Sequence, residues 1–511
     1  MSSIGGGLRS TEATEELRSG HVARCMERYP ESGGTGPYFD TECSTLNPHN
    51  VGKGIYVYGT LPLFLARATG DQLTQITGDS SHSSFYGLHL VWRGLSALAE
   101  TAIILVVFLI GVTLLDRRAA LLAAGLYSVV VLSIQQAHFG TVDAITNLCC
   151  ALGLLFAARV WKAGRLSDHA LFGLVCGCAL ASRINVAPLA GLVLLAPLPT
   201  LAGHWRSGHP TGDLARKAGV GLVAAGLLTL LTFRVLNPYA FSGPGFFGLT
   251  PNLHWLEDLV EARRLVSGLV DIPPNWQWLG RAPWLFPLNN ILLWGLGPAL
   301  GLTAAAGTLW ALLRLLQRRP DSTRVLLPLV WAAGYFALLG GGHVASMRYF
   351  LPLYPALTLL AAWCLLRLVQ INVGWRRTLA LVVIVVVPAF TLVWALMFSN
   401  IYRHQLTRVQ ASHWFWERVP GDFAMRVEST EGEPPLINIP VANRGSHGDL
   451  PARASRYETG QPFSQYVRAT ADGLLRSVHI PHLGDPLADS GNETLSFVLA
   501  DPVSGDTLAA F

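Results

Sequence analysis

Long apolar runs separated by short connections constrain this chain more than any other feature of its sequence. A helix needs roughly 20 apolar residues to cross the ~30 Å hydrocarbon core of a bilayer. Stretches of this kind occur at about 93–115, 119–135, 144–161, 170–203, 218–236, 288–316, 325–342, 349–369 and 378–399. The run 170–203 is too long for one crossing and is interrupted by Ser182-Arg183-Ile184-Asn185, so we expect two spans there. The pattern predicts a mainly α fold, a polytopic transmembrane helix bundle.

Composition indicates that lipid is the solvent for most of the chain. Apolar residues make up 51% and charged residues only 14%, whereas charged residues alone are about 25% of a typical soluble domain. The formal net charge is +5, but Lys and Arg form short clusters between apolar runs and no continuous stripe. This arrangement predicts membrane lipids as the surroundings and argues against nucleic acid as a partner.

Basic residues gather in alternate connections, and this asymmetry predicts the orientation. The clusters are Arg117 and Arg118; Arg159, Lys162 and Arg165; Arg206, Arg216 and Lys217; Arg314, Arg318, Arg319 and Arg324; Arg367, Arg376 and Arg377. By the positive-inside rule these connections are cytoplasmic. The connections 135–143, 182–185, 237–287 and 340–348 then lie on the other side. We therefore expect a multi-pass protein of the plasma (inner) membrane whose active face is extracytoplasmic.

The same orientation divides the chain into three parts. Residues 1–92 form an extracytoplasmic loop and interfacial segment, 93–399 the transmembrane core with a long outer loop at about 237–287, and 400–511 an extracytoplasmic C-terminal region. Strand-like pieces such as 495–499 predict that this last region is small and β-rich. Residues 1–92 hold neither a long apolar span nor a signal peptide. We expect an upstream start that supplies a first membrane helix, and crossing by another route is the alternative.

Cysteine placement leaves one pairing open. Five of the seven cysteines lie inside apolar runs, where cysteine behaves as a small hydrophobe. Cys25 and Cys43 lie outside these runs and either form a disulfide or remain free. Cys176 and Cys178 are two residues apart, so they point to different faces of a helix and no metal site is expected there.

Asp143 is the strongest candidate for a catalytic residue in this sequence. It ends the outer connection 135–143 and opens the next span. The helix dipole stabilises an anionic side chain at a helix N-terminus, which leaves this carboxylate available to a base, a metal or an acceptor hydroxyl. An ordinary capping aspartate is the alternative. His138 is a candidate to support a metal or a proton transfer, with interfacial packing as its alternative.

Three arginines lie at the outer ends of spans, against the charge rule. They are Arg93, Arg183 and Arg348. A cation near hydrocarbon costs free energy unless it snorkels or meets an anion. Lipid phosphate is the obvious anion, because the guanidinium fork matches its oxygens. Snorkelling to the headgroups explains any one of these residues, whereas three together favour a shared anionic site.

Six segments share one order and one side of the predicted bundle. They are Tyr38-Phe39-Asp40-Thr41 through Ser44-Thr45-Leu46-Asn47-Pro48, Tyr56-Val57-Tyr58-Gly59-Thr60-Leu61-Pro62, His138-Phe139-Gly140-Thr141-Val142-Asp143, Asn237-Pro238-Tyr239-Ala240-Phe241, Pro273-Pro274 with Gln277-Trp278, and Arg348-Tyr349-Phe350-Leu351-Pro352-Leu353-Tyr354-Pro355. In this order the segments resemble the PMT-like polyprenyl-phosphate-dependent glycosyltransferases of the GT-C superfamily. The resemblance extends over about 38–400 and implies a GT-C-like bundle.

The resemblance also implies roles for individual residues. The donor phosphate would be held by Arg93, Arg183, Arg348, Tyr349 and Tyr58. Asp143 matches a carboxylate that opens a later span in the family. An acidic pair expected in the first outer loop, whose aspartate acts on the acceptor, has no clear counterpart, since Thr14-Glu15-Glu16-Leu17-Arg18 matches it poorly. Glu16 and Asp40 remain as candidates for that base.

These roles imply that the protein is an enzyme, a glycosyltransferase of the hexosyl or mannosyl type. It would move a sugar from a polyprenyl-phosphate donor to a hydroxyl of an acceptor protein, lipid or glycan. The sequence demands no cofactor, although a divalent metal between carboxylate and phosphate is compatible with it. Two rivals stay open, a multi-pass transporter or flippase and a non-catalytic binder of lipid-linked glycans. Polar residues at the outer rim favour surface chemistry, because transporters use ionisable residues at mid-membrane.

Overall fold

The computed structural model divides the chain into two compact units, Met1–Ser399 and Asn400–Phe511. It describes residues 22–411, apart from 33, 35, 52, 85–86, 208–209, 271, 371–373 and 406, together with 423–429, 436–439, 473–479, 497–501, 504 and 506–510.

The first unit is a bundle of apolar helices. Among the described residues, 8 helices are long and apolar enough to cross a membrane. They are α3 (Leu88–Leu114), α6 (Val142–Ala163), the run Ile184–Arg206 with α8 (Ala190–Leu195) and α9 (Leu198–Arg206), α10 (Gly212–Leu236), α14 (Pro298–Leu316), α15 (Leu326–Leu339), α16 (Tyr354–Val369) and α17 (Gly374–Ser399). The prediction of a mainly α, polytopic transmembrane bundle is confirmed.

One further candidate span is bent, and one apolar helix of the bundle is shorter. Helices α4 (Arg117–Ser128) and α5 (Val131–Ala137) meet at 57° and together are apolar enough for one span. Helix α7 (Leu166–Leu180) is a shorter apolar helix of 15 residues. It is followed by a turn and the 3-10 helix η4 (Ile184–Leu189), so the chain breaks at 182–185, where the sequence predicts a break.

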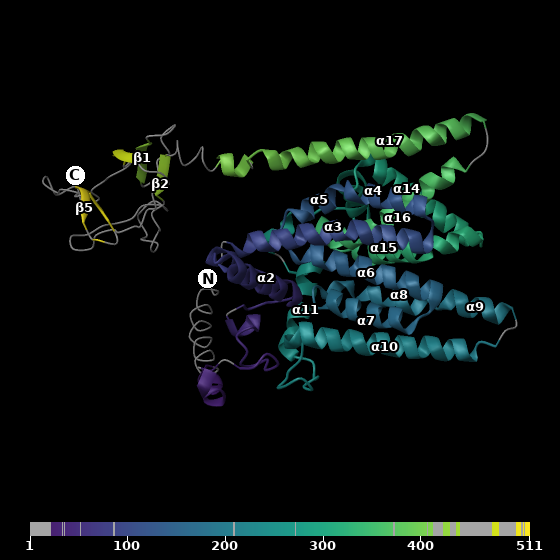
Figure 1. The fold of residues 1–511 in the computed structure, drawn as a ribbon, viewed down its shortest axis with the longest axis horizontal. Coiled ribbons are helices and arrows are strands. Elements are labelled where there is room, and N and C mark those ends of the chain that lie inside the picture. The colour runs from purple at the N-terminus through teal and green to yellow at the C-terminus, as the bar shows by residue number, and fades with distance from the viewer. Residues whose placement is uncertain are drawn as a thin grey trace. The chain divides into compact units, whose positions relative to one another are not determined.

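Helix α16 forms the centre of this bundle. In its span, which includes the 3-10 helix η8 (Met347–Leu353), 89% of the most apolar window is buried, against 22% for α10 and for α17. Figure 1 shows α10 and α17 at opposite margins of the bundle. Small residues allow close helix contacts: a Cβ at Gly173 of α7 would lie 2.4 Å from the Ala225 carbonyl oxygen of α10. Such contacts replace the hydrophobic effect as the force between helices in lipid.

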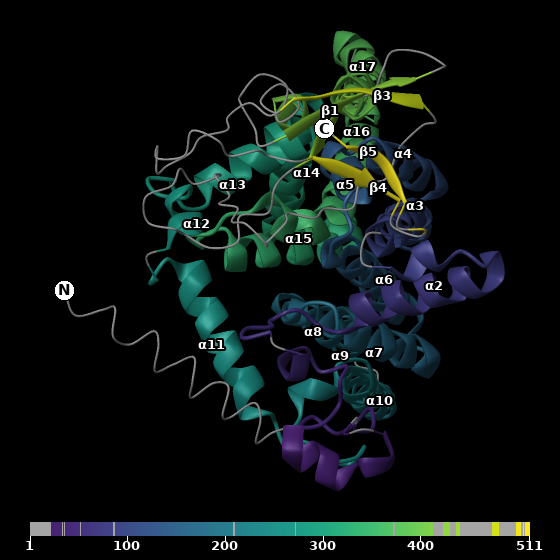
Figure 2. The ribbon, with the colours of Figure 1, turned by 90° about the vertical axis from the view of Figure 1, so that its left-hand side faces the viewer.

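Segments that are not part of the spans gather at one end of the bundle. Residues 22–84 precede the spans, and we call them the first outer segment after their predicted side. They contain a helix at 22–28, η1 (Pro30–Ser32), η2 (Pro48–Val51), α2 (Leu61–Thr77) and η3 (Ser80–Ser83). The long loop contains η5 (Pro238–Ala240), α11 (Leu253–Ser267), α12 (Pro273–Trp276), α13 (Leu285–Asn289) and the π-helical η6 (Asn290–Gly295). Both views place α2 and α11 at the same end (Figures 1 and 2).

A disulfide joins Cys25 and Cys43 in the first outer segment. It decides between the two alternatives that the sequence leaves open for these residues. The other five cysteines are free, and each lies within a helix of the bundle. The cross-link ties the helix at 22–28 to the turns that precede η2.

The second unit contains short antiparallel strands. Strands β1 (Phe423–Ser429), β2 (Leu436–Ile439) and β3 (Gly473–His479) form a sheet of order β2-β1-β3. Strands β4 (Val498–Ala500) and β5 (Thr507–Ala510) pair separately. A 3-10 helix, η9 (Asn400–Arg403), opens the unit, and residues 407–411 are helical. In the first unit, the 3-10 helix η7 (Pro320–Val325) directly precedes α15. The prediction of a small β-rich C-terminal region is confirmed.

Candidate functional site

A buried ion pair joins the start of α6 to the break after α7. Asp143 lies in the first turn of α6 with 3% of its surface exposed, and its Oδ1 accepts a hydrogen bond from Nη1 of Arg183. The chain at Arg183 is extended, between the end of α7 and the start of η4, which turns the side chain toward α6. Charges that are this well buried need such a partner, because an unpaired one would keep its full desolvation cost.

The second oxygen of Asp143 is available. Its Oδ2 is buried and has no hydrogen-bond partner among the described residues. Unsatisfied buried acceptors are rare in folded proteins and often mark a site that binds or reacts. The carboxylate therefore offers one oxygen to Arg183 and one to a ligand.

Aromatic rings fix the guanidinium of Arg183. Its Cζ lies 4.3 Å from the ring centroid of Tyr349 and 5.8 Å from that of Tyr58. Arg348 lies beside the same ring, 5.6 Å from the Tyr349 centroid, and interacts electrostatically with Asp143 and Tyr58. Five of the predicted site residues thus come together, from α6, from the break at 182–185, from η8 and from the first outer segment. We call Asp143, Arg183, Arg348, Tyr58 and Tyr349 the arginine cluster.

Gly59 explains how Tyr58 reaches this cluster. The Gly59 N–H donates to the carbonyl of Ser182, and the Leu61 N–H donates to that of Ala181, both at 3.1 Å. A Cβ at Gly59 would lie 1.8 Å from the Ala181 carbonyl oxygen. Only glycine allows this approach of one backbone to another. The segment 56–62 is therefore fastened to the residues that immediately precede Arg183.

The first outer segment is also fastened to the start of the long loop. Hydroxyl groups of Tyr38, Thr41 and Thr60 donate to the carbonyls of Val235 (2.7 Å), Phe241 (2.6 Å) and Leu236 (2.5 Å). The Ser44 and Tyr239 hydroxyls lie 2.9 Å apart. Burial raises the pKa of Tyr38 to about 12, so its hydroxyl remains a donor. Three of the six segments that carry the resemblance, 38–48, 56–62 and 237–241, therefore form one packed unit.

The carboxylate of Asp40 accepts hydrogen bonds from nearby residues of the first outer segment. Its Oδ1 accepts from the N–H groups of Glu42 and Cys43, and its Oδ2 accepts from the Tyr29 hydroxyl at 2.7 Å and from Arg28 at 3.4 Å. Burial alone would raise the pKa of Asp40, but these hydrogen bonds outweigh it and lower the pKa below its usual value. A carboxylate with a lowered pKa and four donors is a weak base.

The remaining predicted site residues are Arg93, His138 and Glu16. Arg93 is exposed on α3. Nδ1 of His138, which follows α5, lies 2.7 Å from the carbonyl oxygen of Ile134. Glu16 lies outside the described residues. The structure thus joins two of the three arginines to Asp143.

Sequence reasoning missed two polar groups. Glu100 is buried in α3, where its oxygens accept hydrogen bonds from the Tyr127 hydroxyl (2.7 Å) and from Asn147 (3.1 Å). Glu100 lies within the span α3 and so departs from the pattern of polar residues at the outer rim; it is the single acidic residue of the run 93–115. His49, His254 and Asp258 form the second group, signalled by a histidine and an aspartate four residues apart.

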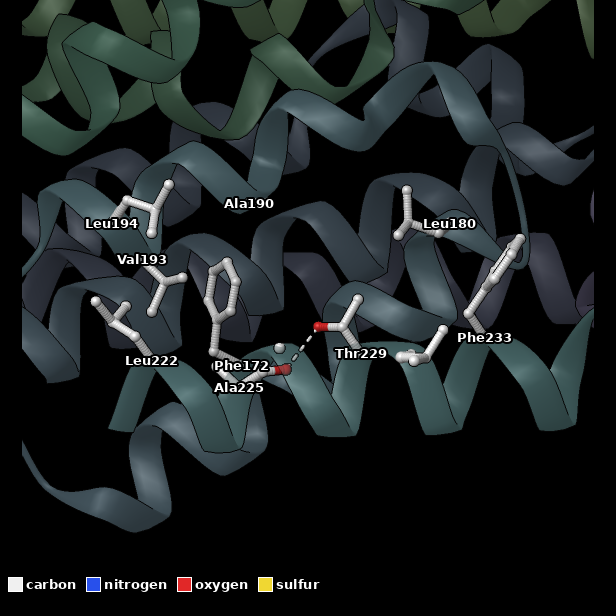
Figure 3. A pocket seen from close by; sticks show the side chains of 11 residues that line it. Phe172, Leu180, Ala190, Val193, Leu194, Leu222, Ala225, Thr229 and Phe233 are labelled. Atoms are coloured by element: carbon white, nitrogen blue, oxygen red, sulfur yellow. Dashed lines mark hydrogen bonds between the residues drawn. The ribbon is translucent and has the colours of Figure 1, made fainter. Parts of the chain in front are cut away.

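An apolar groove runs along α7, α8 and α10 (Figure 3). Its volume is about 310 Å³, and its lining consists of Phe172, Leu180, Ala190, Val193, Leu194, Leu222, Ala225, Gly226, Thr229, Leu230 and Phe233. Leu194 and Leu230 on this lining are exposed, so the groove is open at the bundle surface. Leu180 on this lining is three residues before Arg183 of the arginine cluster.

Comparison with known proteins gives one family match. The model for dolichyl-phosphate-mannose-protein mannosyltransferase matches residues 85–214, a segment that contains Asp143 and Arg183. The match confirms, over that segment, the resemblance carried by the motifs. No curated protein matches the chain.

Several solved structures are similar in fold. The oligosaccharyltransferase of Archaeoglobus fulgidus in the apo form is 17% identical, with a TM-score of 0.48, over 71% of this chain and 50% of that one. ArnT from Cupriavidus metallidurans bound to undecaprenyl phosphate is 16% identical, with a TM-score of 0.44, over 71% of this chain and 63% of that one. The chain thus spans between half and two thirds of the length of these proteins.

Proposed function

We propose that this chain is a membrane glycosyltransferase that moves a sugar from a polyprenyl-phosphate donor to an acceptor hydroxyl at the extracytoplasmic end of its helix bundle. The observation that carries the proposal is the arginine cluster, in which a buried carboxylate with a vacant oxygen lies among two guanidinium groups. The motif resemblance and the family match over residues 85–214 support the same reading.

Arg183 and Arg348 are the groups that would bind the donor phosphate. Both are held against Tyr349, so little side-chain entropy remains to be lost when the phosphate binds. Guanidinium groups bind phosphate through paired N–H donors, and such charge-assisted bonds are about twice as strong as neutral ones. The same charges stabilise the phosphate as it leaves the sugar.

The apolar groove would hold the start of the polyprenyl chain. It is lined almost wholly by aliphatic and aromatic side chains, and a buried CH₂ group contributes about 0.8 kcal/mol. Because Leu180 of the groove is three residues from Arg183 in the sequence, we expect a lipid phosphate at the cluster to direct its tail toward the groove.

Asp143 would accept the proton in the transfer step. The acceptor oxygen attacks the anomeric carbon, and its proton passes to Oδ2 of Asp143. The bond between the anomeric carbon and the phosphate oxygen breaks, and polyprenyl phosphate leaves with the electron pair. General base catalysis of this kind contributes roughly 10²–10⁴-fold. The step needs no further reactant.

A metal does not fit the residues around Asp143. The carboxylate is paired with one guanidinium and lies near a second, which opposes the binding of another cation. Among the described residues, no group of three metal-ligating side chains includes Asp143. The proposed step therefore relies on the two arginines for charge stabilisation.

A transporter or flippase for lipid-linked sugars is the second candidate, and Glu100 is the observation that favours it. Ionisable residues inside spans often mark transport pathways. Here, however, both oxygens of Glu100 accept hydrogen bonds from Tyr127 and Asn147, which suits a buried tie between helices α3, α4 and α6. We therefore favour the enzyme.

Replacement of Asp143 by Asn tests the proposal. The full chain in proteoliposomes receives a polyprenyl-phosphate donor with a labelled hexose, and a membrane extract supplies the acceptor. We expect sugar transfer to fall at least about 100-fold in Asp143→Asn, because the amide cannot accept the proton. Asp116→Asn is the matched control, since Asp116 also lies at a helix N-terminus but caps α4 at the other end of the bundle.

Three outcomes would contradict the proposal. Equal transfer by Asp143→Asn and the unaltered chain would remove Asp143 from the mechanism. Movement of the labelled donor across the bilayer without sugar release would support the transporter. Donor binding without release or movement would indicate a non-catalytic binder.

A further inference from the structure

Two histidines and an aspartate meet on the loops outside the spans. His49 belongs to η2 in the first outer segment, whereas His254 and Asp258 belong to α11 in the long loop. One ligand atom from each lies within 4.8 Å of those from the other two. Since about 200 residues separate His49 from α11, the fold and not the local sequence brings them together.

The ring of His49 is oriented as in a metal ligand. Its Nδ1 lies 3.0 Å from the carbonyl oxygen of Lys53, an acceptor that fixes a proton on Nδ1. Its Nε2 then points at Oδ2 of Asp258, also at 3.0 Å. Histidine ligands of metals commonly donate their second ring N–H to a backbone carbonyl in this way, which leaves the other nitrogen for the metal.

Asp258 is a buried carboxylate that faces this nitrogen. Its side chain is only 5% exposed, and its Oδ2 also accepts the N–H of Tyr56 at 3.1 Å. Two acceptor atoms, the ring nitrogen and the carboxylate oxygen, would repel each other at 3.0 Å unless a cation or a proton lies between them. A positive charge between these two atoms would therefore be stabilised by its surroundings.

His254 supplies the third ligand. It lies four residues before Asp258, so both side chains project from the same face of α11. Its ring centroid is 4.2 Å from that of His49, and the residue is exposed. Ligand atoms in a tetrahedral zinc site are about 3.4 Å apart, since each bond is about 2.0–2.1 Å. A small rotation of the exposed His254 side chain closes the difference from 4.8 Å.

We propose that His49, His254 and Asp258 bind a divalent transition metal, zinc in the first instance, with water as the fourth ligand. Two imidazole nitrogens and one carboxylate oxygen form a set that zinc accepts readily, whereas magnesium prefers oxygen ligands alone. The site lies on α11 and η2, and none of its residues belongs to the arginine cluster.

The metal would hold the two outer segments together. Tyr56 donates its N–H to Asp258 and is two residues from Tyr58, whose ring faces Arg183. A bond network from α11 through the metal to η2 would therefore limit the motion of the segment 56–62. Metal binding would raise the stability of the folded chain, because the ligands are assembled only when both segments are in place.

Zinc titration of the full chain tests the site. The protein carries an affinity tag without histidine, is stripped with a chelator in detergent, and is titrated with Zn²⁺ against a chromophoric competitor. We expect one zinc per chain that His254→Ala weakens at least about tenfold. Because His254 is exposed, this variant should fold normally. His343→Ala is the matched control, since His343 lies in an outer loop and contacts the Asn275 carbonyl.

Two further measurements separate a metal site from a simple ion pair. Co²⁺ bound to the unaltered chain should give the visible absorption of a tetrahedral site, and His254→Ala should lose it. Zn²⁺ should raise the melting temperature of the unaltered chain and of His343→Ala but not that of His254→Ala, and Mg²⁺ should have no such effect. The proposal is overturned if the unaltered chain binds no zinc, or if His254→Ala binds it as tightly as His343→Ala does.

Discussion

The guanidinium of Arg183 lies over the ring of Tyr349, 4.3 Å from its centroid, while Nη1 of the same group donates to Asp143. The ring fixes the plane of the guanidinium, and the carboxylate fixes its rotation within that plane. The remaining N–H groups therefore keep one direction. An arginine prepared in this way can bind an anion with little further loss of conformational entropy.

Arg183→Lys should weaken the binding of polyprenyl phosphate. Lysine keeps the charge but loses the paired donors and the stacking on Tyr349, which together are worth about 1–3 kcal/mol, or roughly 5- to 150-fold in Kd. Arg93→Lys is the matched control, because Arg93 is exposed on α3. Tryptophan fluorescence titration with the lipid phosphate would measure both. An equal loss in the two variants would contradict the separation of Arg93 from the cluster.

Gly59→Ala should displace Tyr58 from the cluster. The added Cβ would lie 1.8 Å from the Ala181 carbonyl oxygen, so the backbone must move. Overpacking of this kind costs about 1–3 kcal/mol, and we expect a lower melting temperature together with weaker donor binding. Gly54→Ala is the control, because a Cβ at Gly54 meets open space. A melting temperature equal in both variants would show that the backbone contact is not as close as described.

Gly226→Leu should fill the apolar groove. A Cβ at Gly226 meets no atom within 4 Å, so the leucine side chain can enter the groove without distorting α10. We expect weaker binding of long-chain polyprenyl phosphates, by about 15- to 60-fold if two or three CH₂ groups are displaced, and unchanged binding of a short-chain analogue. Gly219→Leu lies on the same helix, outside the groove, and should bind both as the unaltered chain does. Equal loss for short and long chains would argue against the groove as the tail site.

Tyr127→Phe should destabilise the bundle by about 1–3 kcal/mol. The hydroxyl donates to Glu100 at 2.7 Å, and its removal leaves a buried carboxyl oxygen with one donor fewer. Tyr354→Phe is the control, since the Tyr354 hydroxyl is buried without a hydrogen-bond partner among the described residues. Its removal should leave stability unchanged or slightly raised. Thermal unfolding in detergent would compare them, and equal melting temperatures would show that Glu100 is not held through Tyr127.

The positions of the spans could be predicted from the sequence because bilayer thickness fixes the length of an apolar run. The gathering of Asp143, Arg183 and Arg348 could be predicted as well, since alternate connections must emerge on the same side. Which arginines join Asp143 could not. Val91, Ser96, Ala99 and Ile103 are the buried residues of α3 near Arg93, whereas Arg93 itself is exposed. The charge rule predicts the side of the membrane on which an arginine lies, but not the direction in which its side chain points.

Contacts between distant segments could not be predicted from the sequence, for a related reason. The sequence leaves Asp40 as a candidate base, but a tight turn gives its carboxylate two backbone N–H donors from the residues that follow it. His49 meets Asp258 only because the first outer segment packs on the long loop. Such packing depends on the shapes of both surfaces. The sequence of one segment carries no information about the shape of the surface on which it packs.

The bond between Cys25 and Cys43 has a consequence for how the protein is made. Disulfides form and persist in oxidising compartments and are rare where glutathione and thioredoxin keep thiols reduced. We therefore expect maturation of the first outer segment to require a thiol oxidase. A strain that lacks this oxidase should accumulate the chain without this disulfide, and proteases should then cleave the first outer segment more readily.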